Sequence, residues 1–177
     1  MATAPTGVSR ILVTALGAAM LLFLSASAQQ PAGLPSAERV RGGMFDASDA
    51  SGLARFMEKT GYRVELGADA KGDPVITGRI SRTDYVVQFY ECENGQFCNS
   101  VQFLAQAPKP AAVTADTCNA FNVRWRYVRL TIDGAQVRLQ MDVNLDAGVT
   151  ADNLEDTLDI WKQLVEIFER EVLGIKP

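Results

Sequence analysis

Hydrophobic side chains follow two different periods in the second half of the chain. Between residues 136 and 145 apolar and polar residues alternate, which predicts a β-strand with one face on the core and the other on water or a partner. Between residues 154 and 172 the period changes to about 3.6 residues, which predicts an amphipathic helix, the longest element of the chain. The apolar positions are Val137, Leu139, Met141, Val143 and Leu145 in the strand, and Leu154, Leu158, Trp161, Leu164, Val165, Phe168 and Val172 in the helix.

Shorter runs of β-branched and aromatic residues precede this strand. Four in succession predict an antiparallel meander that ends at the two prolines of residues 108–112. A further run at residues 124–132 is joined to the strand at 136–145 by Asp133-Gly134, a dipeptide that favours a hairpin. The four runs of the meander are residues 62–66, 74–80, 85–92 and 100–107.

Three helices are expected around these strands. The first begins at Asp46 or Ser48 and ends near Gly61. The sequence Val-Thr-Ala-Asp at 113–116 and again at 149–152 predicts two more helix starts, because each threonine can accept a hydrogen bond from the third helical amide.

The middle helix is expected to be short, at residues 115–122, with Cys118 as a buried free thiol that packs on Val113. The order is then α-ββββ-α-ββ-α. It predicts an α+β fold, a two-layer sandwich of an antiparallel sheet with the helices on one face.

Residues 1–28 differ from the rest of the chain and predict a signal peptide. Arg10 is their one charged side chain, residues 11–24 form an apolar run, and Ala26-Ser27-Ala28 is a small-residue cleavage site. The alternative is an uncleaved anchor, but these 14 apolar residues fall short of the about 20 that span a membrane. We expect cleavage after Ala28, a linker at residues 29–43 and a folded domain at residues 44–177.

The signal peptide predicts a periplasmic or secreted protein with no stable membrane span after cleavage. Loss of Arg10 leaves 16 Lys and Arg against 21 Asp and Glu, a formal charge of −5. A negative charge of this size argues against nucleic acid as a partner.

Candidate chemistry is limited, because the chain contains no histidine. This excludes Ser-His-Asp and Cys-His catalysis and the H-E-x-x-H zinc site. The sequence also lacks the glycine-rich phosphate-binding motifs. We therefore expect no catalytic residue and no cofactor.

Two acidic segments have structural explanations. Asp152, Glu155, Asp156 and Asp159 fall in the first turns of the last helix, where the helix dipole favours carboxylates. Residues 142–146 resemble the opening of a calcium loop, but the required glycine comes one position late and loop position 12 is not glutamate. We expect no metal site.

Cys92 and Cys98 bracket Asn94-Gly95 in the segment ECENGQFCNS. Two thiols without histidine are too few for a tetrahedral zinc site, and their spacing differs from redox C-x-x-C. We predict a disulfide between them, which suits an oxidising compartment. A two-residue turn at Asn94-Gly95 would place Cys92 opposite Phe97, so we expect a wider loop or a bulge, with a positive φ at Gly95.

Arginine and aromatic residues are concentrated at the start of the run at residues 124–132. This combination favours a protein or anionic partner. The alternative is that the arginines pair with the acidic last helix. The candidate partner-binding patch consists of Arg124, Trp125, Arg126, Arg129 and Arg138.

Several short segments resemble the YbjN domain family of bacteria, whose members are described as sensory transduction regulators. The segments are LQMDVN at 139–144, EDTLDIW at 155–161, Gly61-Tyr62-Arg63, Phe89-Tyr90 and NAFN at 119–122, within a resemblance that covers about residues 45–172. The resemblance implies a fold similar to type III secretion chaperones and a non-enzymatic regulator, with no catalytic motif to carry over. The signal peptide would make this an exported member.

We therefore expect an exported binding or regulatory module that engages a protein or envelope partner through its sheet face or a groove beside it. Two alternatives remain, a carboxylate-dependent hydrolase and a carrier of a small apolar ligand. A homodimer is also expected, because it would cover the exposed face and edges of so small a sheet.

Overall fold

The computed structural model describes residues 44–176 of the chain. The expected signal peptide at residues 1–28 and the expected linker at residues 29–43 lie outside the described residues. None of the helices within residues 44–176 is long and apolar enough to cross a membrane.

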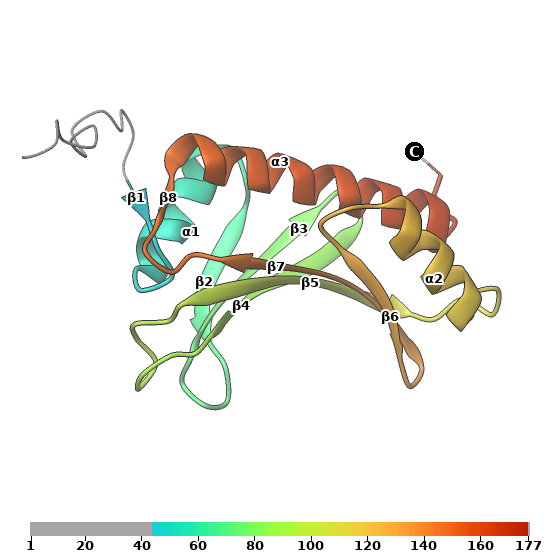
Figure 1. Cartoon of the computed structure of the whole chain (residues 1–177), viewed down its shortest axis with the longest axis horizontal. Coiled ribbons are helices and arrows are strands. Elements are labelled where there is room, and N and C mark those ends of the chain that lie inside the picture. The colour runs from blue at the N-terminus through green and yellow to red at the C-terminus, as the bar shows by residue number, and fades with distance from the viewer. Residues whose placement is uncertain (1–43, 177) are drawn as a thin grey trace, which may run out of the picture. The chain divides into compact units, whose positions relative to one another are not determined.

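Six antiparallel strands form one sheet in the order β2-β3-β4-β5-β7-β6 (Figure 1). The first four strands follow one another as the predicted meander. The last hairpin then joins in reversed order, so that β7 pairs with β5 and β6 becomes an edge. The strands are β2 (Val64–Ala68), β3 (Pro74–Ile80), β4 (Thr83–Tyr90), β5 (Ser100–Pro108), β6 (Arg129–Asp133) and β7 (Gln136–Asn144).

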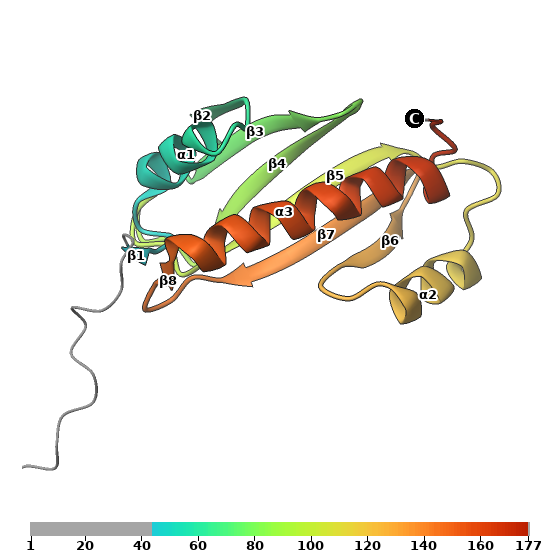
Figure 2. The ribbon, with the colours of Figure 1, turned by 90° about the horizontal axis from the view of Figure 1, so that it is seen from above.

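Three helices lie on the same side of this sheet. The longest, α3 (Ala151–Ile167), runs across the sheet, with α1 (Ala50–Lys59) and α2 (Ala115–Arg124) towards its two ends (Figures 1 and 2). A π-helical turn, η2 (Phe168–Val172), continues α3, and the two-residue strands β1 (Met44–Phe45) and β8 (Val149–Thr150) pair with each other before it. This arrangement confirms the predicted α+β fold with an antiparallel sheet.

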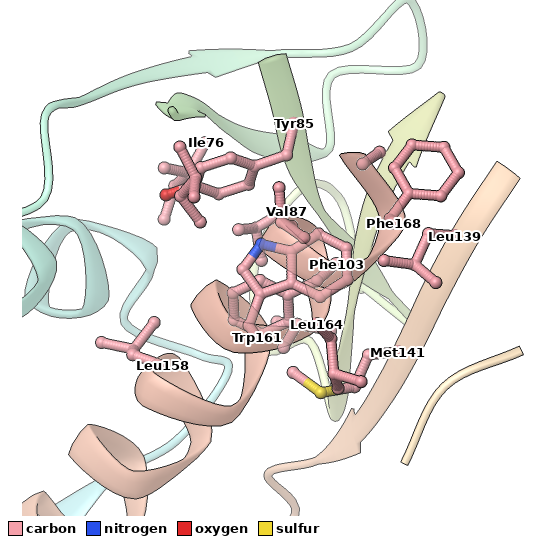
Figure 3. Close-up of a cluster of buried hydrophobic side chains, with 14 of the residues drawn as sticks. Ile76, Tyr85, Val87, Phe103, Leu139, Met141, Leu158, Trp161, Leu164 and Phe168 are labelled. Carbon is pink, nitrogen blue, oxygen red and sulfur yellow. The ribbon is translucent and has the colours of Figure 1, made fainter. Parts of the chain in front are cut away.

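The core lies between α3 and the sheet, with Trp161 at its centre. The Trp161 ring centre is 5.5 Å from that of Phe103 on β5 and 6.0 Å from that of Tyr85 on β4 (Figure 3). All three side chains are buried. The alternation in β7 has the predicted effect, because its apolar residues Leu139 and Met141 are buried against this cluster.

The predicted helix starts are confirmed at two positions and wrong at one. Thr114 accepts a hydrogen bond from the amide of Thr117, and Thr150 accepts one from the amide of Asn153. The first helix, however, is capped by Asp49 rather than by Asp46 or Ser48. Asp49 accepts from the amide of Gly52 at 2.7 Å, whereas Asp46 binds the amide and hydroxyl of Ser48.

The predicted strand at residues 124–132 is wrong at its start. Helix α2 continues to Arg124, and the amide of Trp125 still donates to the carbonyl of Phe121 at 2.9 Å. From inside this longer helix, the Asn122 amide group donates to the Leu130 carbonyl at 3.1 Å and accepts from the Leu130 N–H at 2.6 Å. Tertiary contacts of this kind override the local β-propensity of an Arg- and aromatic-rich segment.

Cys92 and Cys98 form a disulfide in the structure. The expected bulge and the positive φ at Gly95 are confirmed, but a two-residue turn and the disulfide coexist, which we had not expected. Glu93 and Gln96 pair across Asn94 and Gly95, whose φ angles are 54° and 74°, as a type I′ turn requires. Phe97 takes up the extra residue as a bulge with a φ of 52°.

Candidate binding surface

The five residues predicted as a partner-binding patch lie on two separate parts of the domain. Arg124 ends α2, Trp125 caps it, and Arg126 follows in the connection to β6. Arg129 lies in β6 and Arg138 in β7. Their strand neighbours point into the core, so both of these arginines project from the sheet face opposite α3, which we call the open face.

Both arginines on the open face are already paired with acids on the same hairpin. Arg129 pairs with Asp142, and Arg138 pairs with Asp133. Burial alone raises the pKa of Asp142, but hydrogen bonds from Gln102 and Arg129 and the charge of Arg129 outweigh it, so the pKa is lowered overall. These arginines therefore belong to a network that connects β5, β6 and β7.

The other three residues line a groove between α3 and the connection that follows α2, which we call the Trp125 groove. Its volume is about 290 Å³. Leu164 is buried in its floor, and Tyr127 is 61% exposed. The lining residues are Arg124, Trp125, Arg126, Tyr127, Ile160, Gln163, Leu164 and Ile167.

The indole of Trp125 is held in place by residues of α2 and η2. Its nitrogen donates to Glu171 Oε2 at 3.3 Å, and the same oxygen pairs with Arg124 at 3.3 Å. The Arg124 guanidinium carbon lies 4.7 Å from the indole ring centre, and the Phe121 ring centre lies 6.3 Å away. A fixed aromatic side chain of this kind offers contact area at little further cost in side-chain entropy.

Arg126 carries the available positive charge of the Trp125 groove. Within residues 44–176 it has no carboxylate partner within 4.0 Å, and its guanidinium carbon lies 5.0 Å from the Tyr127 ring centre. Arg124, in contrast, is neutralised by Glu171. Among the described residues, the groove therefore combines an apolar floor with a guanidinium that has no acidic partner. This combination suits a segment that presents both apolar and acidic side chains.

The acidic segments form no metal site in the part of the chain that the structure describes. No three His, Cys, Asp or Glu side chains are grouped there so that they could hold an ion. In the segment that resembles a calcium loop, Asp142 binds Arg129, and Asn144 accepts from the amide of Asp146 at 2.9 Å. The other acidic group, Asp152, Glu155, Asp156 and Asp159, is exposed along α3.

Three buried polar groups between α1, α3 and the sheet have no hydrogen-bond partner within residues 44–176. They are the hydroxyls of Tyr62 and Tyr85 and the indole nitrogen of Trp161. Burial raises the pKa of Tyr62 to about 12, with the charges of Asp159, Glu155 and Glu166 adding to it. Burial, and then proximity to Tyr62, raises the pKa of Tyr85 as well. Both phenols are therefore neutral and take part as packing groups.

Glu169 is a buried acid that sequence reasoning missed. It is only 5% exposed, and its Oε1 accepts from the amide of Arg82 at 2.8 Å and the hydroxyl of Thr83 at 2.7 Å. The signal was its position four residues after Val165, on the apolar face of the helix. Through Oε1, Glu169 attaches η2 to the β3–β4 turn.

Comparison with known proteins assigns the fold to a family. A sequence model of the YbjN family, described as "Putative bacterial sensory transduction regulator", matches residues 49–173. No curated protein matches the chain. The match covers α1 to η2 and agrees with the resemblance seen in the sequence. The chain belongs to the YbjN family.

Proposed function

We propose that this domain is an exported, non-enzymatic regulatory module that binds a polypeptide segment in the Trp125 groove. The observation that supports it most directly is the pairing of an apolar floor at Leu164 with the free guanidinium of Arg126. The expected ligand is a segment with apolar side chains for the floor and an acidic side chain for Arg126. Binding such segments would be a chaperone-like activity. The description of the family as a sensory transduction regulator supports the regulatory part of the proposal.

The two alternatives lack a comparable supporting observation. A carrier of a small apolar ligand would need a cavity between helix and sheet, but Trp161, Phe103 and Tyr85 occupy that space. A carboxylate-dependent hydrolase would need two acids about 5 to 9.5 Å apart that are free to act on a substrate. Asp142 and Glu169, two candidates, are committed to Arg129 and to the β3–β4 turn.

Site-specific photo-crosslinking tests the groove directly. A photoreactive amino acid at Tyr127, at the groove, should capture a discrete polypeptide in the intact cell. The same amino acid at Lys71, an exposed position in the β2–β3 loop, serves as the control. Equal capture from both positions, or no adduct from Tyr127, would contradict the proposal.

Peptides from the captured segment then test the chemistry. Arg126→Glu should weaken peptide binding at least about tenfold, because it replaces attraction of an acidic side chain by repulsion. Lys71→Glu makes the same change in net charge and should leave the dissociation constant unchanged. Fluorescence anisotropy of a labelled peptide measures both, and equal affinity of the two variants would exclude the groove as the binding site.

The predicted export is tested by a separate measurement. N-terminal sequencing of the protein recovered from the periplasm or medium should begin at Gln29. A protein that keeps Met1 and stays inside the cell would refute the localisation while leaving the peptide-binding test intact.

A further inference from the structure

Strand β2 forms an edge of the sheet that has no further strand partner among residues 44–176. Strand β2 pairs with β3 on its inner side, and no backbone group from elsewhere in residues 44–176 hydrogen-bonds to its outer side. Figure 2 shows β2 at one margin of the sheet, beside α1. Leu66 is 40% exposed at this edge. A strand in this position offers a row of unpaired N–H and C=O groups to another strand.

The sequence around β2 is complementary to itself when reversed. It reads Tyr-Arg-Val-Glu-Leu from residue 62 to residue 66. Val64, the first residue of β2, is at the centre, and Tyr62 and Arg63 precede the strand. An antiparallel copy centred on Val64 places Arg63 opposite Glu65, and Glu65 opposite Arg63. The same pairing brings Leu66 next to Tyr62 of the other copy, whose ring is partly buried and whose hydroxyl lies in the core. Opposite charges and aromatic–aliphatic pairs that face each other directly stabilise antiparallel strands.

The charges needed for this pairing are available in the monomer. Arg63 and Glu65 are both exposed, and neither forms an ion pair within residues 44–176. Within the sheet Glu65 lies opposite the uncharged Thr77 of β3. The charge pattern at this edge is thus complementary to that of a second copy of the chain.

We infer that a second copy of this chain pairs antiparallel with β2 around Val64, which joins two six-stranded sheets into one continuous sheet. The twofold axis passes between the two Val64 residues, and the interface is isologous. Next to the junction on each copy, the open face carries a hollow of about 660 Å³ lined by Arg63, Glu65 and Thr77 among others. The two hollows therefore flank the junction on one shared face.

The other edge does not offer the same opportunity. Strand β6 also carries opposite charges at its two ends, Arg129 and Asp133, but both are engaged by partners on β7. The Asn122 side chain occupies the N–H and C=O of Leu130, which therefore point away from β7. An incoming strand at β6 would have to displace Asn122, so the inference is specific to β2.

Charge reversal tests the pairing. The contact is small, so the purified protein should pass from monomer to dimer between about 1 and 300 µM in sedimentation equilibrium. Arg63→Glu and Glu65→Arg should each weaken association at least tenfold, because each places like charges opposite one another. An equimolar mixture of the two variants should associate again, and so should the double variant R63E/E65R. Lys162→Glu on α3 is the control for net charge.

Cysteine crosslinking tests the register. Val64→Cys places two thiols directly opposite each other across the twofold axis, at a separation that a disulfide can bridge. Leu66→Cys places each thiol opposite Tyr62 and should crosslink much less. The crosslink at position 64 should depend on protein concentration and be suppressed by Glu65→Arg.

Three outcomes would overturn the inference. They are a monomer throughout the concentration range, a dimer that withstands both single charge reversals, and equal crosslinking at positions 64 and 66. Circular dichroism of each variant shows whether loss of association follows from loss of the fold. Peptide binding in the Trp125 groove is measured separately, so either idea can fail alone.

Discussion

The two edges of the sheet have similar charge patterns but different neighbours. Both β2 and β6 are five-residue strands. Arg129 and Asp133 lie at the two ends of β6, whereas at β2 the opposite charges are Glu65 in the strand and Arg63 just before it, so that a reversed copy would be complementary at either edge. At β6 the charges are neutralised from β7, and Asn122 occupies the outward backbone of Leu130. At β2 neither the charges of Arg63 and Glu65 nor the outer backbone edge has a partner within residues 44–176. The comparison shows that an edge is open or closed because of its surroundings rather than its own sequence.

The closed edge should be the more sensitive to a single substitution. Asn122→Ala removes both hydrogen bonds to Leu130 and leaves its N–H and C=O without protein partners. We expect a loss of about 3 kcal/mol in the free energy of unfolding, measured by urea denaturation. Asn119→Ala, at an exposed position of the same helix, should cost less than about 0.5 kcal/mol.

Asn122→Ala should also open β6 to association. In an Arg63→Glu background, where the β2 edge is blocked, added Asn122→Ala should restore self-association at high concentration. A double variant that stays monomeric would show that Asn122 stabilises β6 without protecting its edge.

Strand β3, which pairs with the open edge strand β2, packs closely against a buried ring at Gly78. A Cβ atom at Gly78 of β3 would lie 2.6 Å from both Cζ and the hydroxyl oxygen of the buried Tyr85 ring. Gly78→Ala should therefore cost about 2 kcal/mol of stability, because the ring must move within a packed core. Gly67→Ala in β2 is the matched control, since its nearest neighbour would be a carbonyl oxygen at 3.9 Å. Equal losses in the two variants would contradict the contact.

The edges should also differ in their response to acid. The pKa of Asp142 is lowered in the folded protein, so its ion pair with Arg129 contributes stability above the unfolded pKa of about 3.9. That contribution is lost as the pH falls through the lower folded value. Both side chains are about half exposed, so the loss should be at most about 1 kcal/mol. Urea unfolding of Asp142→Asn from pH 6 to about 3 should show a correspondingly smaller decline.

The smallest effect is expected from a substitution that stabilises the open edge strand β2. Gly67 has ordinary backbone geometry and room for a side chain, so Gly67→Thr should stabilise β2 by about 0.5 kcal/mol. Gly61→Thr should destabilise instead, because Gly61 has a φ of 97°. In thermal unfolding, the midpoint temperature should rise for Gly67→Thr and fall for Gly61→Thr if the two backbone conformations differ as described.

Local patterns in the sequence predicted much of the fold. The alternation in β7, the 3.6-residue period of α3 and the caps at Thr114 and Thr150 all depend on residues close in sequence, and the structure contains them. The predicted cap of α1 was wrong because Asp46, Ser48 and Asp49 can all cap a helix. Only the path of the chain selects among them.

The candidate patch shows where local patterns stop being informative. Arg124 and Arg129 are five residues apart, and a continuous strand would have kept them together. The longer α2 separates them, and its length depends on contacts of Asn122 and Trp125 with distant segments. The position of β7 between β5 and β6 is equally a long-range property. Neither could be predicted from spacing alone.

The disulfide of the β4–β5 hairpin has a consequence for oxidative folding. Three cysteines allow three pairings, and the native one joins the two that are nearest in sequence, six residues apart. Closing so short a loop costs less chain entropy than bringing Cys118, 20 residues beyond Cys98, to either of them. The correct bond is thus also the one that an unfolded chain forms most readily. Once α2 has docked, burial of Cys118 protects the bond from thiol exchange.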